Sequence, residues 1–327
     1  MFRNLACLGA LGLTLSIHLS LTFAQSEPAY PARRITYIVP STPGAGADFP
    51  PRIIADKLSK SLGQPVVVEN RPGASWTIGT EYALRQPADG YTILHVAQIH
   101  ALNPSFMPKL PYDPIKDFDA ITHAVSTIFV MTVHPSVPAK TIQEFIALAR
   151  ANPGKYTYGS VGSGSSHHLG GALLESMTGI KMLHVPFKGG SQIVQALISG
   201  QIDATFISVF PVTKFIQSGK LNGLAVTTTF RSSLLPEIPT MEEAAGLKGY
   251  DMDVWQGVVA RAGTPRPVIA RLNREINAIV KDKTEAQRLR EVGYEPAGTT
   301  PEQFTELMKA ELAKWSKIIK EADIKPE

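Results

Sequence analysis

Two glycine-rich stretches of this chain, residues 44–49 and 162–168, have the composition of loops that bind anions. The first consists of glycine and alanine up to Asp48, and the second alternates glycine with serine before two histidines. Small residues let backbone amides approach a ligand, and amides, hydroxyls and the N-terminus of a following helix all favour negative charge. Both stretches are therefore predicted to contact an anionic ligand.

The first stretch partly matches the dinucleotide-binding fingerprint, which follows a strand and contains three spaced glycines. Gly44 and Gly46 fit this fingerprint, and Glu69 lies near where a ribose-binding acid is expected. The third glycine is replaced by Phe49, and Asp48 would set a carboxylate near the pyrophosphate. Nucleotide binding is therefore disfavoured, and no cofactor is predicted.

A serine hydrolase is a second hypothesis, suggested by the serines of residues 162–168. A nucleophile elbow requires glycines two residues before and two residues after the serine. Neither Ser163 nor Ser166 has glycine at both positions, so no catalytic residue is predicted. This loop is expected either to bind an anion or to form a plain capped turn.

Metal binding is a third hypothesis, suggested by the histidines. His167 and His168 are adjacent, so they point to different sides of a helix and cannot chelate together as an i, i+4 pair could. The remaining histidines form no ligand spacing with carboxylates, and no metal site is predicted. His100 and His167 are expected either to donate to a carboxylate or to have a core or surface role.

The chain has 327 residues and a formal net charge of +4. This mild charge, without interleaved aromatic residues, favours a small anionic ligand over nucleic acid. Residues 1–24 are mostly apolar and a polar segment follows Ala24, which predicts a cleaved secretory signal peptide rather than a membrane anchor. The only cysteine, Cys7, lies in this segment, so disulfides and thiolate chemistry are excluded from the mature chain.

The elements that position the two loops alternate between short apolar strands and amphipathic helices. An apolar run at 35–39 precedes the first loop, and apolar residues spaced by four from Ile54 predict a helix after it. Thr141 with Glu144 forms a capping box that opens another helix, and residues 121–133 form a long extended stretch leaving the first domain. The alternation predicts an α/β fold with doubly wound parallel sheets, and the length predicts two domains.

A family resemblance is carried by the segments PARRITYIVPSTPGAGAD, QPVVVENRPGA, LPYDPIKDF, HPSVPAKTIQEFIALARANPGKYTYGSVGSGSSHHL, HVPFKGG and TPEQFTELMKAELAKWSKIIKEA. In this order they resemble the periplasmic solute-binding proteins of tripartite tricarboxylate transporters, the Bug or TctC family. The resemblance implies a two-lobed Venus flytrap with two interdomain crossovers, residues 25–127 and 252–327 forming lobe 1 and residues 128–251 forming lobe 2. It also implies a monomer that hands a carboxylate to a membrane permease without catalysis. A receptor that reports to a sensor kinase is an alternative.

The resemblance also implies which residues hold the ligand, largely through backbone groups and ordered water. In lobe 1 these are Thr42, Gly44, Ala45, Gly46, Ala47, Asp48 and Phe49 in the first loop and Ala97, Gln98 and His100 after a later strand. In lobe 2 they are Ser163, Ser165, Ser166, His167 and Ser208. An anion shared by both lobes would favour closure only when it is bound.

Aromatic residues distinguish this chain from the pattern common in the family. Trp76 lies in a stretch that is commonly glycine-rich, and residues 206–210 lack the aspartate often present in members that bind amino acids. With Phe49, Phe206 and Phe210 nearby, we expect a flat or apolar acid, with the aromatic dicarboxylate terephthalate as the leading candidate. Aliphatic ligands such as succinate, adipate or citrate are the alternative, and the aromatic residues would then only pack.

Pro50 and Pro51 remove two amide donors from the start of the first helix. We expect them to push Phe49 and Pro50 away from helical geometry, so that the helix begins later than Asp48. Residues 46–47 and neighbouring water would then hold the carboxylate, and Asp48 would fix the loop.

Overall fold

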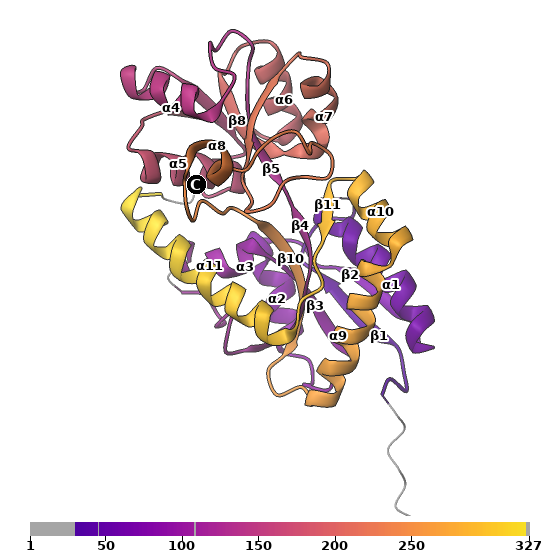
Figure 1. Cartoon of the computed structure of the whole chain (residues 1–327). Coiled ribbons are helices and arrows are strands. Elements are labelled where there is room, and N and C mark those ends of the chain that lie inside the picture. The colour runs from indigo at the N-terminus through magenta and orange to yellow at the C-terminus, as the bar shows by residue number, and fades with distance from the viewer. Residues whose placement is uncertain (1–29, 45, 108, 325–327) are drawn as a thin grey trace, which may run out of the picture.

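The computed structural model of the chain describes residues 30–44, 46–107 and 109–324. These residues form two lobes, each built on its own β-sheet (Figure 1). The signal peptide predicted at residues 1–24 lies outside the described residues. Within the described part of the chain, no helix has the length and apolar character needed to cross a membrane.

Lobe 1 contains a six-stranded sheet with the strand order β11-β4-β10-β3-β1-β2. Its strands are β1 (Ile35–Val39), β2 (Val66–Asn70), β3 (Thr92–Ala97), β4 (Phe118–Thr127), β10 (Val254–Arg261) and β11 (Tyr294–Pro296). Its helices are α1 (Phe49–Leu62), α2 (Thr77–Leu84), α3 (Gln98–Phe106), α9 (Arg266–Lys281), α10 (Lys283–Glu291) and α11 (Pro301–Glu321). β1 pairs in parallel with β2 and β3, as expected for strands connected through helices.

Lobe 2 contains a five-stranded sheet with the strand order β7-β6-β8-β5-β9. Its strands are β5 (Phe129–Val133), β6 (Thr157–Ser160), β7 (Leu183–Pro186), β8 (Ala204–Ser208) and β9 (Asn222–Val226). Its helices are α4 (Ile142–Ala151), α5 (Ser166–Thr178), α6 (Gly190–Ile198), α7 (Val209–Gln217) and α8 (Met241–Ala245). The capping box predicted at Thr141 and Glu144 is confirmed at the start of α4.

Two segments of the chain pass between the lobes. β4 ends at Thr127 in one sheet and β5 begins at Phe129 in the other, and the chain returns through residues 251–253 into β10 (Figure 1). β5 and β10 both run antiparallel to their neighbours, so the prediction of parallel sheets is wrong at these strands. The reason is that these strands enter their sheets directly from the other lobe instead of after a crossover helix. We propose that the lobe boundaries fall at the two crossovers, giving residues 25–127 with 252–327 and residues 128–251.

Helix α11 joins the two lobes by apolar packing. Phe304 and Met308 pack into a core cluster of lobe 1, whereas Trp315 and Ile319 belong to a cluster formed mainly by lobe 2. In Figure 1, α11 lies to the left of the crossover strands, whereas α7 and β11 lie to their right. The lobes are therefore packed together along α11. On the α7 side of the crossover strands they meet at a second, separate contact.

Candidate functional site: the cleft between the lobes

The first predicted anion loop is fixed by Asp48. Gly44 donates its backbone N–H to Asp48 Oδ2 over 2.8 Å, and Arg52 donates Nε–H to the same oxygen over 2.7 Å. Asn70 donates its side-chain amide to Asp48 Oδ1 over 2.8 Å. Asp48 is only 1% exposed, and both of its oxygens accept hydrogen bonds from these neighbours. The prediction that Asp48 fixes the loop is confirmed, and its carboxylate is engaged inside the protein instead of facing a ligand.

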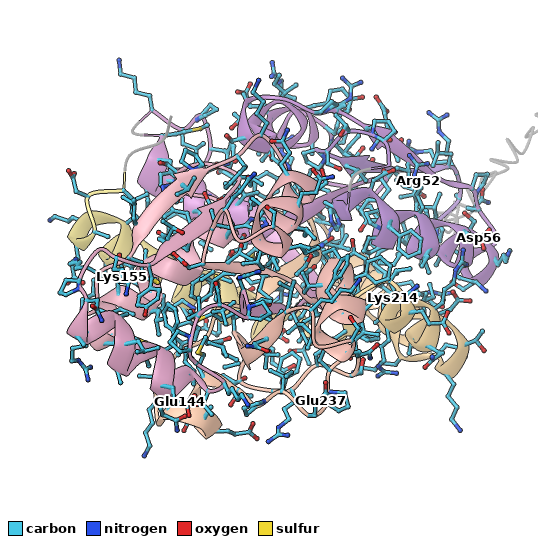
Figure 2. The ribbon with its side chains drawn as sticks, turned by 90° about the horizontal axis from the view of Figure 1, so that it is seen from above. Arg52, Asp56, Glu144, Lys155, Lys214 and Glu237 are labelled. Carbon is cyan, nitrogen blue, oxygen red and sulfur yellow. The ribbon has the colours of Figure 1, made fainter. Side chains whose placement is uncertain are left out.

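Asp48 remains ionised in this setting. Burial raises the pKa of its carboxyl, but hydrogen bonds from Arg52, Asn70 and Gly44 outweigh burial and hold the pKa below its ordinary value. Arg52 lies on α1, one turn before Asp56, at the edge of the molecule in Figure 2. The Arg52 guanidinium is therefore paired with Asp48.

The two prolines lie in the first turn of α1. A short 3₁₀ turn, Gly46–Asp48, leads into α1, which begins at Phe49. The helix begins later than Asp48, as predicted, but the prediction that Phe49 and Pro50 leave helical geometry is wrong. Proline is tolerated there because the first N–H groups of a helix have no partner within the helix.

A cavity of about 440 Å³ opens between the lobes beside this loop. Its lining consists of Gly44, Gly46, Ala47, Phe49, Thr127, Gln256, Val292, Gly293 and Tyr294 from lobe 1 and Phe129, Ser208, Phe210 and Pro211 from lobe 2. None of these residues carries a charged side chain. An anion in this cavity would therefore be held by neutral N–H and O–H donors and by the positive ends of helices.

Four aromatic rings enclose the cavity. Phe49 and Tyr294 are stacked, with ring centroids 6.2 Å apart and planes within 11°, and the Tyr294 hydroxyl donates to the Gly46 carbonyl. Phe129 lies on the first strand of lobe 2, and Phe210 is 52% exposed on the first turn of α7. The cavity thus offers flat apolar walls around neutral polar groups.

Five of the residues predicted to hold the ligand line this cavity, namely Gly44, Gly46, Ala47, Phe49 and Ser208. Thr42 is exposed in the same loop but is not part of the lining. Ala45 lies outside the described residues.

Two aromatic residues predicted near the ligand lie elsewhere. Phe206 is fully buried because it points toward α5, where a Cβ placed on Gly170 would lie 2.8 Å from the Phe206 ring. Trp76 packs beside the buried His95 ring, with centroids 5.9 Å apart, and does not line the cavity. Phe206 and Trp76 therefore do not contribute to an aromatic pocket, whereas Phe129 and Tyr294, which were not predicted, line the cavity.

The second pair of predicted loops meets at the junction near α11. Ser166 donates from Oγ to Gln98 Oε1 over 3.3 Å, which links lobe 2 to lobe 1. Gln98 is 1% exposed and donates to Glu311 Oε2 over 3.0 Å. Ala97 is buried at the N-cap of α3. These groups connect the lobes but lie outside the lining of the 440 Å³ cavity.

The remaining predicted polar residues have structural contacts of their own. Ser165 caps α5 by accepting the His168 N–H over 3.4 Å, and Ser163 lies half-buried in the same loop. The His167 ring packs on Phe129 with centroids 5.1 Å apart, and burial lowers the pKa of His167 to about 4. This histidine therefore lies behind the cavity wall in its neutral form.

His100 is a core residue, and its prediction as a ligand-binding residue is wrong. Its ring stacks on Tyr112 and meets the edge of Phe118, and its Nε2–H donates to the Pro114 carbonyl over 3.1 Å. The position after β3 led to the prediction, but the helical turn of α3 directs the side chain into the core.

Sequence reasoning missed seven residues of the cavity lining: Thr127, Phe129, Pro211, Gln256, Val292, Gly293 and Tyr294. Thr127 and Phe129 flank the first crossover, and Gln256 lies on the strand that follows the second. Two features of the sequence could have indicated these three residues. Gln256 is a polar residue within the apolar run 254–260, and any segment that crosses between the lobes must pass the cleft. Tyr294 had no such signal, because β11 was not predicted.

A larger hollow of about 1170 Å³ lies elsewhere on lobe 1, between the first turns of α9 and α11. Its lining comes from one lobe alone, so lobe closure would not enclose a ligand there. Among the described residues, no cluster of three or more histidine, cysteine, aspartate or glutamate side chains could hold a metal ion.

Comparison with known proteins gives matches along most of the chain. Residues 51–324 match the sequence profile of a family described as the tripartite tricarboxylate transporter family receptor. The UPF0065 protein in the tcbD-tcbE intergenic region of Pseudomonas sp. strain P51 is 38% identical over 310 residues, covering 95% of this chain and 92% of the relative.

Two solved structures are similar in both sequence and fold. Rpa4515 of R. palustris with adipate is 34% identical, with a TM-score of 0.74, over 91% of this chain and 100% of that one. MatC (Rpa3494) from Rhodopseudomonas palustris with bound malate is 26% identical, with a TM-score of 0.70, over 89% of this chain and 100% of that one. The similarity therefore extends through both lobes and both crossovers.

Proposed function

Because the chain belongs to the tripartite tricarboxylate transporter receptor family of periplasmic solute-binding proteins, we propose that it captures a small carboxylate and delivers it to that transporter's permease. The observation that carries this proposal is the cavity between the lobes. Its lining combines glycines of the first loop, neutral polar groups and no charged side chain. Such a site suits an anion that must be released again, because neutral donors bind less tightly than a buried ion pair.

The leading ligand candidate is an aromatic dicarboxylate such as terephthalate. Phe49, Tyr294, Phe129 and Phe210 supply flat walls on both sides of the cavity. An aromatic ring between such walls gains contact area and ring–ring interactions worth about 0.5–1.5 kcal/mol per pair beyond area burial. A benzene ring with two carboxylates is also small enough for a cavity of about 440 Å³.

An aliphatic di- or tricarboxylate is the second candidate, and a specific observation favours it. The related structures Rpa4515 and MatC hold adipate and malate, which are both aliphatic dicarboxylates. In that case the aromatic walls would pack on methylene groups instead of a ring.

We place the ligand contacts at Gly44, Gly46, Ala47 and Phe49 of lobe 1 and at Ser208 of lobe 2. The first loop offers backbone amides at the start of α1, and Ser208 precedes α7 without using its side chain as a cap. The positive ends of two helices would then face the same anion from opposite lobes. Binding would favour closure because the ligand contacts both lobes only when they are closed.

The remaining parts of this proposal concern location and partners. A signal peptide ending at Ala24 would export the chain to the periplasm, where it would act as a monomer. The permease is the proposed partner, and a sensor kinase is the alternative. Pull-down of the mature protein with each purified domain, with and without ligand, distinguishes the two.

A thermal-shift screen tests the proposed function. At 100 times the dissociation constant, one site adds about 2.7 kcal/mol of stability, which raises the melting temperature visibly. We expect a shift with terephthalate, adipate or citrate and none with a neutral sugar. No shift with any carboxylate contradicts the proposal. Recovery of chemically altered ligand by mass spectrometry would instead support a hydrolase.

A further inference from the structure

A row of hydrogen-bonded side chains crosses four neighbouring strands beneath the cavity. Tyr37 Oη on β1 lies 3.3 Å from His95 Nδ1 on β3, and His95 Nε2 lies 3.1 Å from Gln256 Oε1 on β10. Gln256 Nε2 in turn donates to Thr127 Oγ1 on β4 over 3.1 Å. The strands are adjacent in the order β4-β10-β3-β1, so the row runs straight across the sheet. It begins in the core and ends at two residues that line the cavity, Gln256 and Thr127.

The direction of each hydrogen bond in this row follows from its members. The Gln256 carbonyl oxygen can only accept, so His95 must carry its proton on Nε2. Burial lowers the pKa of His95 to about 4, so the ring is neutral near pH 7 and its Nδ1 must accept. Tyr37 is fully buried, and among the described residues its hydroxyl has His95 as its hydrogen-bond partner. The Tyr37 proton therefore points at Nδ1, which fixes the whole row in one direction.

This direction determines what the cavity presents to a ligand. Gln256 turns its carbonyl toward the core and its NH₂ group toward Thr127 and the cavity. Because Thr127 Oγ1 already accepts from Gln256, its own O–H remains a donor. Tyr294 lies beside them: burial raises the pKa of Tyr294 to about 12, while a hydrogen bond from Gln256 opposes this shift. The Tyr294 O–H is already donated to the Gly46 carbonyl, so the groups that this floor offers to a ligand are the Thr127 O–H and the Gln256 NH₂, which also contacts Thr127 and Tyr294.

We propose that Gln256 and Thr127 form a neutral donor subsite for one carboxylate of the ligand and that His95 is the positioning residue that holds the Gln256 amide in its donating orientation. This inference rests on the proposed function, because it assigns a subsite of the same cavity. The subsite selects a carboxylate over a carboxamide, since an amide nitrogen would bring its own N–H groups against donors. The first loop would bind the second carboxylate, so the preferred ligand is a diacid instead of a monoacid.

The test compares diacids with their monoamides by isothermal titration calorimetry. The probes are terephthalate with 4-carbamoylbenzoate and adipate with its monoamide. Gln256→Glu replaces the donor by a carboxylate of the same shape, and Gln201→Glu is the matched control, since Gln201 is exposed far from the cavity lining. We expect the wild type to prefer a diacid over its monoamide by at least about 10-fold. Gln256→Glu should weaken the diacid about 100-fold and reverse the preference, and Gln201→Glu should change neither value.

His95 is tested by a pair of variants that separates positioning from packing. His95→Leu removes the donor to Gln256, whereas His95→Gln keeps an N–H near the position of Nε2. We expect His95→Leu to lower diacid affinity about 10-fold and His95→Gln to restore it to within about threefold, at similar melting temperatures. Thr127→Val, which keeps the shape and removes the hydroxyl, should lower diacid affinity about 10-fold and provides a second test if Gln256→Glu does not fold.

The outcomes separate this inference from the proposed function. If the wild type binds a diacid and Gln256→Glu binds it within threefold as tightly, the donor subsite is wrong. If His95→Gln binds as weakly as His95→Leu, the positioning role of His95 is wrong. If the wild type binds no diacid at all, the proposed function fails and the subsite fails with it.

Discussion

Phe210 of lobe 2 packs against Gly293 of lobe 1 across the mouth of the cleft. A Cβ placed on Gly293 would lie 2.7 Å from the Phe210 Cβ, so the close approach requires glycine. Gly293 also has a φ of +89°, which disfavours any larger residue. Both residues line the cavity, and their contact is a point at which the two lobes meet on the side of the cleft away from α11.

This contact predicts faster ligand release when it is removed. Phe210→Ala should raise the dissociation rate of a bound dicarboxylate about 10-fold, because the side chain both covers the cavity and joins the lobes. Stopped-flow fluorescence measures the rate. Phe230→Ala is the control, because Phe230 is similarly exposed on lobe 2 but does not line the cavity. An equal rate for Phe210→Ala and the wild type would contradict the role of this contact.

A second prediction separates core aromatic residues from cavity aromatic residues. Phe206→Ala should destabilise the protein by about 3–5 kcal/mol, because Phe206 fills the space left by Gly170. It should leave the affinity ratio of terephthalate to adipate unchanged. Phe49→Leu should instead lower that ratio with a smaller loss of stability, since the Phe49 ring lines the cavity. Thermal unfolding and calorimetry measure both quantities, and a changed ratio in Phe206→Ala would place that residue in the site.

The positions of these aromatic residues illustrate what sequence could and could not predict. The first strand, the loop and the helix after it follow from local apolar spacing, so the first-loop residues of the cavity were predicted. Phe206 and Trp76 were predicted near the ligand because they are close in sequence to loop positions. The direction of a side chain depends on what packs against it, which is Gly170 for Phe206 and His95 for Trp76, and a single sequence does not supply that partner.

The missed parts of the fold have similar causes. Helix α3 contains Pro104, which resembles a helix breaker in sequence, and α10 is dominated by charged and polar residues without an apolar stripe. Strand β11 has three residues and is held by its register with β4, a partner more than 160 residues away in the chain. Such elements form because of tertiary contacts rather than local preference, so Tyr294 and its side of the cavity could not be predicted.

Asp253 gives a prediction about pH. Burial raises the pKa of this carboxyl to about 8; a hydrogen bond from Ser126 and the charge of Lys314 lower it, whereas Asp251 and Glu311 raise it. Between about pH 4 and pH 8 the native state therefore holds a proton that the unfolded chain releases, so this group's contribution to stability falls as pH rises.

The measurement is the melting temperature of the wild type minus that of Asp253→Asn from pH 5 to pH 8. Asparagine keeps the shape and cannot ionise, so this difference should decrease steadily with pH. Asp56→Asn is the control, because Asp56 is more than half exposed on α1 (Figure 2) and ionises below this pH range. The difference in melting temperature between the wild type and Asp56→Asn should therefore not change with pH. A flat difference for Asp253→Asn would show that Asp253 is ionised throughout.

A fourth prediction concerns the first loop. Asp48→Asn removes the charge that Arg52, Gly44 and Asn70 share, and the new NH₂ group faces donors. We expect a loss of about 3 kcal/mol in stability and at least 10-fold weaker dicarboxylate binding, because the loop loses its fixed shape. Circular dichroism and calorimetry check the two effects. Unchanged binding in a destabilised variant would mean that the shape of this loop does not determine affinity.

The central claim, that a small carboxylate binds in the cleft between the lobes, is tested most directly by titration of a variant with a blocked cavity. Gly46→Glu adds a carboxylate beside Tyr294 without positive-φ strain, and Gln201→Glu adds the same charge on the surface. Calorimetry of the wild type with the carboxylate giving the largest thermal shift should show one ligand per chain. Binding should be lost in Gly46→Glu and kept in Gln201→Glu. Equal binding by Gly46→Glu and the wild type would contradict the claim.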